Sequence, residues 1–189
     1  LVLTREEVFM TAVRHAASVR IRTGVNNDGR IVARKVEATY DTGAYADNGP
    51  RVAKRAASRI HGPYKIKHCK VDILAVYTNT VPAGSMRSIG GPQTIWALEC
   101  HMDSIARRLA IDPLEFRLKN LLKAGEELRA GARPIDADLS MGANIAARGI
   151  GWGKVKKNPG RGLGIAVGVS DSEAMPVSVA LVRLLADGS

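Results

Sequence analysis

"VPAGSMRSIGGPQTIWALE", residues 81–99, joins two segments of opposite character. Its first half is small and rich in glycine, and it carries a single arginine, Arg87. From Pro92 onward apolar residues recur three and four positions apart, which places them in one stripe along a helix. That stripe contains Ile95, Leu98, Met102, Ile105 and Leu109. The sequence therefore predicts a glycine loop over residues 83–91 that leads directly into a core helix.

The glycine loop has two interpretations. Gly84, Gly90 and Gly91 allow backbone N–H groups to approach a ligand closely, and Arg87 adds a planar guanidinium with several donors. Pro92 fixes the start of a helix whose first N–H groups favour an anion. A cradle for a phosphate or a heterocycle is one interpretation. The other is a plain strand-to-helix turn with an arginine at the surface.

Composition bounds the kind of molecule. The chain has 189 residues, of which 46% are apolar and only 4% aromatic, so the core is expected to be mostly aliphatic. No apolar run reaches the ~18 residues that a membrane span needs, and no signal pattern opens the sequence. We therefore expect no membrane partner. Cys69 and Cys100 lie far apart without metal-binding or redox spacing, which indicates a reducing compartment, the cytoplasm.

The net charge is +10, which is compatible with nucleic acid, an acidic membrane or an acidic partner chain. A nucleic-acid module would combine clustered Lys and Arg with exposed aromatics. Here the cations are scattered and the aromatics are scarce, so we expect no nucleic-acid partner and retain a basic nucleic-acid module only as an alternative.

Strands and helices are mixed along the chain without regular βαβ alternation, which predicts the α+β class. Asp28-Gly29 is the turn of a long hairpin, and Asp112 and Pro113 begin a helix that Gly125 ends. Other predicted elements are a capped turn at 4–7, a helix at 47–62 capped by Asp47 or Asn48, a strand at 65–79, a weak helix at 138–150, a linker at 153–162 and strands near 163–169 and 177–185.

Few side chains have the spacing that catalysis or metal binding requires. The four histidines show no ligand-like spacing, so no protein-ligated metal is expected. Arg51, Arg55 and Arg59 recur every four residues, with Lys54 beside them. These cations form either a solvated stripe or a face from which one arginine enters a cavity and holds a polar substrate.

At this point the order of motifs resembles one family closely. The chain is similar to the molybdenum-binding subunit of the xanthine dehydrogenase/aldehyde oxidase family, the molybdenum hydroxylases, from Leu3 to about Leu122 and more loosely to the end. The motifs are "LTREEVFMTAVRH", "IRTGVNNDGRIVA", "DTGAYADNGPRV", "GPYKI", "GSMRSIGGPQ" and "DPLEFRLKNLL". The resemblance implies a partial molybdopterin-binding domain whose glycine loop lies against the pterin cofactor.

The resemblance also implies roles for single residues. Arg87 matches the loop arginine beside the molybdenum centre, and Met86, Gly90 and Gly91 complete the cofactor-binding set. Ile89 stands where xanthine-oxidising members have a phenylalanine that stacks on the substrate, and an isoleucine cannot stack in that way. By its spacing from "GPYKI", Arg55 takes the place of a substrate-orienting arginine.

The family's catalytic glutamate and its other cofactor segments have no match in this sequence. We therefore expect an internal fragment, residues 1–189, with no catalytic residue of its own. Its expected parts are a main lobe at 1–125 with a cofactor-facing loop at 83–93, a weak helix and linker at 126–160, and the start of a following sheet at 161–189. None of its glutamates is expected to be the base: Glu6, Glu7, Glu37, Glu99, Glu115, Glu126, Glu127 and Glu173.

By resemblance, the whole enzyme hydroxylates a heterocycle or oxidises an aldehyde through molybdopterin, with the cytosine dinucleotide as one form of the cofactor. FAD and [2Fe–2S] clusters are expected on partner subunits or domains, and a small molecule is the substrate. The fragment alone is expected to be inactive, to bind no cofactor, and to self-associate through apolar faces that the rest of the subunit would cover. A scaffold relative that kept the fold and lost the site is a further alternative.

Overall fold

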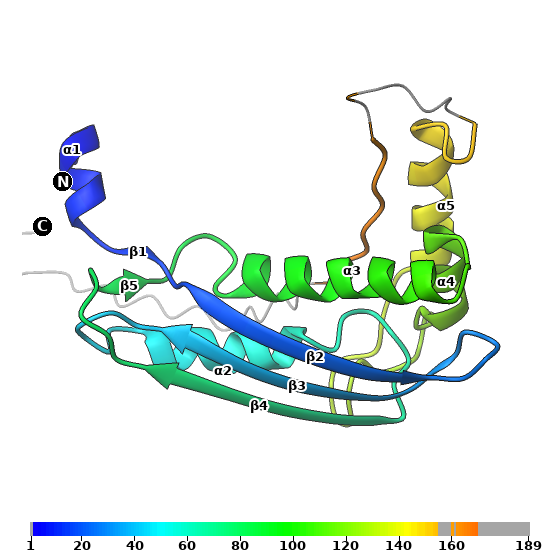
Figure 1. Cartoon of the computed structure of the whole chain (residues 1–189), viewed down its shortest axis with the longest axis horizontal. Helices are drawn as coiled ribbons and strands as arrows, with labels where there is room; N and C mark the ends of the chain where they lie inside the picture. Colours follow the sequence, from blue (N-terminus) through cyan, green and yellow to red (C-terminus); the bar gives the residue numbers. More distant parts are fainter. Residues whose placement is uncertain (1, 155–159, 161, 170–189) are drawn as a thin grey trace, which may run out of the picture.

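The computed structural model describes residues 2–154, 160 and 162–169 (Figure 1). A three-stranded sheet forms one layer, and α2 and α3 form a second layer on one of its faces. A two-residue pairing of β1 with β5 lies at one end of α3, and α4 and α5 stand at the other end. The helices are α1 (Arg5–Met10), α2 (Gly49–Arg59), α3 (Gly91–Arg108), α4 (Pro113–Asn120) and α5 (Leu139–Gly149); the strands are β1 (Val13–Arg14), β2 (Ala17–Val25), β3 (Ile31–Asp41), β4 (His68–Val76) and β5 (Ala83–Gly84). This mixture confirms the α+β class.

The predicted hairpin is present as the antiparallel pair β2 and β3. Gly29 has a φ of 85° at its turn, a conformation that favours glycine, and its N–H donates to the Asn26 carbonyl over 2.8 Å. The next strand, β4, runs parallel to β3, with α2 as the connection between them. One βαβ unit is therefore built into the sheet, because parallel neighbours need a long crossover. The sequence pattern predicted the strand but not its direction.

The sheet has a buried face and an open face. Along β3, Arg34, Val36, Ala38 and Tyr40 are buried under the helices, and the residues between them are half-buried or exposed. We call the opposite face, which carries no helix among the described residues, the outer face. The core beneath α2 and α3 is mostly aliphatic, as the composition predicts. Its largest cluster includes Ile31, Val36, Ile60, Tyr64, Leu98, Met102, Ala106 and Phe116.

The helix-start predictions are largely confirmed. Thr4 and Glu7 form the predicted capping box of α1, and the Asp112 carboxylate accepts from the backbone N–H groups of Leu114 and Glu115. Asn48 is the N-cap residue of α2, but its side chain makes no capping hydrogen bond. α5 forms where the weak helix was predicted.

Two end-of-element predictions are wrong. α4 ends at Asn120 rather than near Gly125, because Leu121 turns extended and pairs with Tyr64 in an isolated bridge. Residues 163–169 form no strand. Of the other predicted features, the strand at 177–185 lies outside the described residues, as does much of the linker.

No helix in the described part of the chain has the length and apolar character to cross a membrane.

Candidate functional site

The glycine loop is anchored at its base between two segments that are distant in sequence. Ala83 and Gly84 are buried and pair in parallel with Val13 and Arg14. The Ala83 N–H donates to the Thr42 carbonyl over 2.9 Å. Gly84 has no space for a side chain, since a Cβ there would lie 2.8 Å from the Cβ of Ala12. The base of the loop is thus held rigidly beside β1.

The turn that follows is exposed and conformationally strained. Ser88, Ile89 and Gly90 have φ values of 73°, 34° and 74°, in the left-handed region that non-glycine residues rarely adopt. A positive φ is costly for a β-branched residue such as Ile89, and strain of this kind collects at functional sites. Among the described residues, the N–H groups of Met86 and Arg87 have no hydrogen-bond partner. The turn therefore presents unused donors at the surface.

Arginines from two other elements hold this turn. The Arg59 guanidinium, at the end of α2, donates to the Ser88 carbonyl and, over 3.1 Å, to the Ile89 carbonyl. Arg14 donates to the Arg87 carbonyl over 3.4 Å. Because the loop carbonyls are the acceptors, these contacts fix the backbone and bring the guanidinium groups of Arg14 and Arg59 to the turn that carries Arg87.

Gly90 and Gly91 are explained by packing. A Cβ on Gly90 would lie 2.9 Å from the Val52 carbonyl oxygen, and one on Gly91 would lie 2.7 Å from the Ser88 hydroxyl. Both glycines are buried, so they allow α3 to begin directly against α2. The sequence suggested that these glycines open the backbone to a ligand, and the structure shows that they also bring two helices together.

The other predicted site residues occupy different environments. Met86 and Arg87 are exposed, and Ile89 packs on the small cluster of Ala38, Tyr40, Val52 and Ala56. Arg55 is half-buried one turn before Arg59. Of the basic stripe, Arg59 is the member whose contacts with the loop the structure describes.

Two polar residues beside the loop were not selected from the sequence. His15 is 2% exposed; its Nδ1 lies 2.8 Å from the Asp41 carbonyl, and its Nε2 has no partner among the described residues. Gln93, in the first turn of α3, donates to the His15 carbonyl over 2.9 Å, and its buried Oε1 is also unpaired among those residues. His15 ends the motif "LTREEVFMTAVRH" and Gln93 ends "GSMRSIGGPQ". A single histidine and a single glutamine show no spacing pattern that would identify them as site residues from the sequence.

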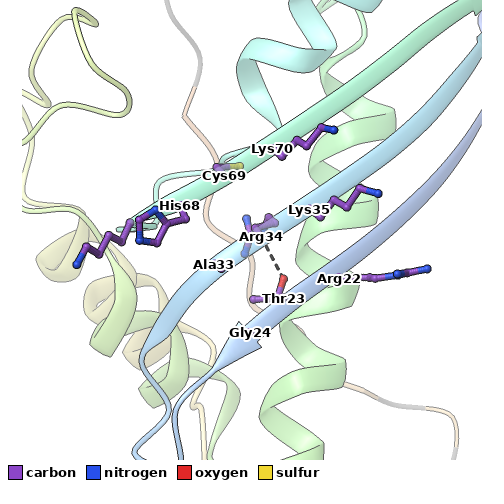
Figure 2. A pocket seen from close by; sticks show the side chains of 10 residues that line it. Arg22, Thr23, Gly24, Ala33, Arg34, Lys35, His68, Cys69 and Lys70 are labelled. Atoms are coloured by element: carbon purple, nitrogen blue, oxygen red, sulfur yellow. Dashed lines mark hydrogen bonds between the residues drawn. The ribbon is translucent and has the colours of Figure 1, made fainter.

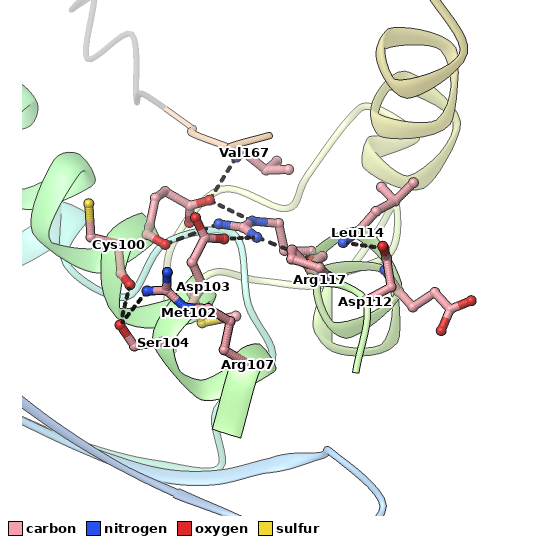
Figure 3. Close-up of polar contacts among 12 residues, drawn as sticks. Cys100, Met102, Asp103, Ser104, Arg107, Asp112, Leu114, Arg117 and Val167 are labelled. Carbon is pink, nitrogen blue, oxygen red and sulfur yellow. Dashed lines mark hydrogen bonds and ion pairs between the residues drawn. The ribbon is translucent and has the colours of Figure 1, made fainter. Parts of the chain in front are cut away.

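Glu99 shows what a buried glutamate does in this fold. Its carboxylate accepts from Arg117 over 2.8 Å and from the Tyr64 hydroxyl over 2.7 Å. The Val167 N–H also donates to it, over 3.0 Å, and Figure 3 shows the hydrogen bonds that Arg117 and Val167 make. Burial lowers the pKa of the Arg117 guanidinium, but the charge and hydrogen bond of Glu99, together with Tyr64 and Asp103, outweigh this and leave the pKa raised. Burial, followed by the Glu99 charge, raises the pKa of Tyr64. Glu99 is thus committed to an ion pair.

A depression on the sheet lies away from the glycine loop. It opens on the sheet, between the ends of β2, β3 and β4, and contains none of residues 83–91 (Figure 2). No group of His, Cys, Asp and Glu side chains within the described ranges could hold a metal ion. The exposed turn of the loop is therefore not part of this depression.

Comparison with known proteins identifies the family. The model of the molybdopterin cofactor-binding domain matches residues 1–121. A probable xanthine dehydrogenase subunit from Bacillus subtilis is 40% identical over 121 residues, 64% of this chain and 16% of that protein. The nicotinate dehydrogenase large molybdopterin subunit of Eubacterium barkeri is 38% identical over 132 residues, 69% of this chain and 31% of that protein.

The fold agrees with this assignment. The aldehyde oxidoreductase from Desulfovibrio gigas superposes with a TM-score of 0.67 and 27% identity, over 74% of this chain and 15% of that one. The chain belongs to the molybdopterin cofactor-binding domain family. It spans less than a third of the length of these curated relatives.

Proposed function

We propose that this chain forms one wall of the molybdenum cofactor site in an oxidoreductase that hydroxylates a heterocycle or oxidises an aldehyde. The observation that carries the proposal is the glycine loop. Its backbone is fixed by β1 and Arg59, and its exposed turn presents N–H groups, unpaired within the described chain, beside Arg14 and Arg87. Family membership supplies the identity of the ligand, and the loop supplies a surface that suits it.

The residues present fit an anionic, polar cofactor. Molybdopterin carries a phosphate, and backbone N–H groups with nearby guanidinium groups favour such a group. Arg87 and the N–H groups of Met86 and Arg87 would bind it, while Gly90 and Gly91 hold the loop against α2. The Nε2 of His15 and the Oε1 of Gln93, unpaired among the described residues, leave further polar capacity behind the loop. When bound, the cofactor supplies two-electron redox chemistry.

Roles beyond cofactor binding follow the same proposal. Ile89 would bound the substrate space without stacking on a ring, and Arg55 would orient a polar substrate. The base and the remaining walls would come from other parts of the subunit, and iron–sulfur and flavin partners would carry electrons onward. The subunit relatives support a multi-chain assembly. Cys69 and Cys100 are both free, which supports a cytoplasmic location.

The test is metal analysis of a subunit that contains this segment, purified with its partners. Arg87→Ala should lower molybdenum content and turnover together. Arg108→Ala, an exposed arginine at the far end of α3, is the matched control and should leave both unchanged. Full molybdenum content and turnover in the Arg87 variant would contradict the proposal. A wild-type subunit that folds without molybdenum or turnover would favour the scaffold alternative.

A further inference from the structure

The outer face of the sheet carries a row of cations in strict register. Arg22 of β2 is paired with Lys35 of β3, and Lys35 is paired with Lys70 of β4. Neighbouring strands are ~4.8 Å apart, so three like charges lie abreast across the sheet. Like charges directly opposite one another destabilise a sheet, and the hairpin register leaves them no alternative position.

The surface around this row is hollowed and basic. Gly24 and Ala33, directly opposite each other in the next row, have small or no side chains and floor a shallow depression of about 690 Å³. Lys67 also lines the depression. Figure 2 shows the three cations of the row, Arg22, Lys35 and Lys70, beside it. The depression therefore faces outward with a positive rim, on the opposite side of the sheet from the packed helices.

The neighbouring carboxylates only partly neutralise this charge. Lys35 contacts Glu37 over 2.6 Å, and Lys70 contacts Asp72 over 3.4 Å, in largely exposed pairs that contribute little. Glu37 is paired with Asp72 of β4 and with Arg20 of β2, so the row beside the cationic one is mixed, with two carboxylates and one cation. The row of Arg22, Lys35 and Lys70 is therefore the one that carries a cation on each of the three strands, and the row beside it alternates in sign from β2 to β3.

The arrangement of charges on the outer face favours an acidic segment that crosses the strands over a nucleic-acid backbone that runs along them. A nucleic-acid backbone that follows β3 or β4 would run from the cationic row onto Glu37 or Asp72, and it would meet a second cation, Arg20, along β2 alone. Within β2, β3 and β4 the outer face also lacks Phe, Tyr and Trp side chains, which leaves the His68 ring as its one aromatic surface for a base. A short acidic segment that crosses the strands would meet cations alone. Carboxylates at i and i+4 on a helix are about 5–6 Å apart, close to the strand spacing.

We propose that the Arg22, Lys35 and Lys70 row docks an acidic helix of a partner polypeptide, with carboxylates at i, i+4 and i+8 lying across the three strands. The inference does not depend on the cofactor, because the row lies on the sheet face opposite α2 and α3. It also accounts for a like-charge row that would otherwise only destabilise the sheet.

The experiment measures binding of a labelled, alanine-based helical peptide with glutamates at i, i+4 and i+8 to the full 189-residue chain at low salt. A scrambled peptide of the same composition, with its glutamates on different faces, is the ligand control. The aligned peptide should bind more tightly, and Arg22→Glu or Lys70→Glu should weaken it about tenfold. Lys54→Glu, the same charge reversal on exposed α2, should leave binding unchanged.

Thermal melting separates docking from misfolding. Arg22→Glu removes a like-charge contact with Lys35, so this variant should melt at or above the wild-type temperature while it loses the peptide. Equal binding of the aligned and scrambled peptides would overturn the proposal. A loss of peptide binding in Lys54→Glu as large as that in Arg22→Glu or Lys70→Glu would also overturn it. Tighter binding of single-stranded DNA of equal charge through Arg22 and Lys70 would overturn it in favour of a nucleic-acid surface.

Discussion

Two structural requirements favour glycine at position 90, a left-handed φ and the absence of a Cβ, and a comparison with Gly125 separates their energetic costs. It has a left-handed φ of 74°, and its missing Cβ leaves room for the Val52 carbonyl. Gly125 has a similar φ of 85° but nothing within 4 Å of its Cβ position. The pair therefore distinguishes backbone strain from close packing.

Gly125→Ala should lower the free energy of unfolding by about 1 kcal/mol, the cost of the left-handed conformation alone. Gly90→Ala should cost about 2–4 kcal/mol, because overpacking against α2 is added. Urea denaturation of the two variants measures the difference. Equal losses would mean that α3 can move away from α2 freely, and the packing role of Gly90 would be wrong.

Arg117 is the largest side chain that is completely buried in the described part of the chain. Its guanidinium also binds Asp103 over 2.7 Å, so it ties α4 to α3 at two carboxylates. Arg117→Met should destabilise the chain by about 3–5 kcal/mol, because Glu99 then remains buried without its cation. Adding Glu99→Leu should restore most of this loss. Arg107→Ala, an exposed neighbour on α3, should change the free energy of unfolding by less than about 0.5 kcal/mol.

Among the elements, those with local signals were predictable and those set by tertiary contacts were not. Thr4, Asp112 and the Asp28-Gly29 turn determine the backbone within a few residues of themselves. The sequence therefore predicts the capping box of α1, the start of α4 and the hairpin, respectively. The end of α4 depends on a bridge between Leu121 and Tyr64, which are far apart in the chain. The parallel direction of β4 depends in the same way on how α2 crosses the sheet.

The candidate site shows the same division. The glycine loop and its following helix were predictable because glycine and proline act locally. The role of Arg59 was not, since an arginine stripe at four-residue spacing looks the same whether it is solvated or bound to loop carbonyls. His15 and Gln93 come together only through the pairing of β1 with β5.

The junction between β2 and α3 predicts a pH dependence. His101 Nε2 lies 2.9 Å from the Thr23 hydroxyl, close to the buried Arg34. Burial, and then the charge of Arg34, lowers the pKa of His101 below its ordinary value of 6.5, and the same causes lower that of His61. Below pH 6.5 the unfolded chain therefore binds protons that the folded chain resists.

The free energy of unfolding should consequently fall as the pH drops from about 7 towards 5, by up to about 1.4 kcal/mol per pH unit for each histidine. His101→Gln should flatten this slope, while His68→Gln, at an exposed position on β4, should not. Urea titrations at several pH values measure the slope of the free energy of unfolding against pH for the wild type and both variants. A slope unchanged in His101→Gln would show that this histidine is not the group that responds.

At the scale of the whole molecule, large apolar side chains remain uncovered. Trp96 on α3 is 72% exposed, and Met141 and Ile145 on α5 are more than half exposed. Large apolar side chains left exposed to water favour association with another surface. The chain alone should therefore self-associate as its concentration rises, and Trp96→Gln should reduce this in sedimentation velocity. A chain that stays monomeric at all concentrations would contradict this expectation.

Whether the glycine loop is a single wall of a shared site is tested most directly by molybdenum analysis of the 189-residue chain. The chain should be produced in cells that make the cofactor, beside a longer subunit that contains the same segment. The account predicts near-stoichiometric molybdenum in the longer subunit and none retained by the chain alone. Stoichiometric molybdenum held by the 189-residue chain itself would contradict it.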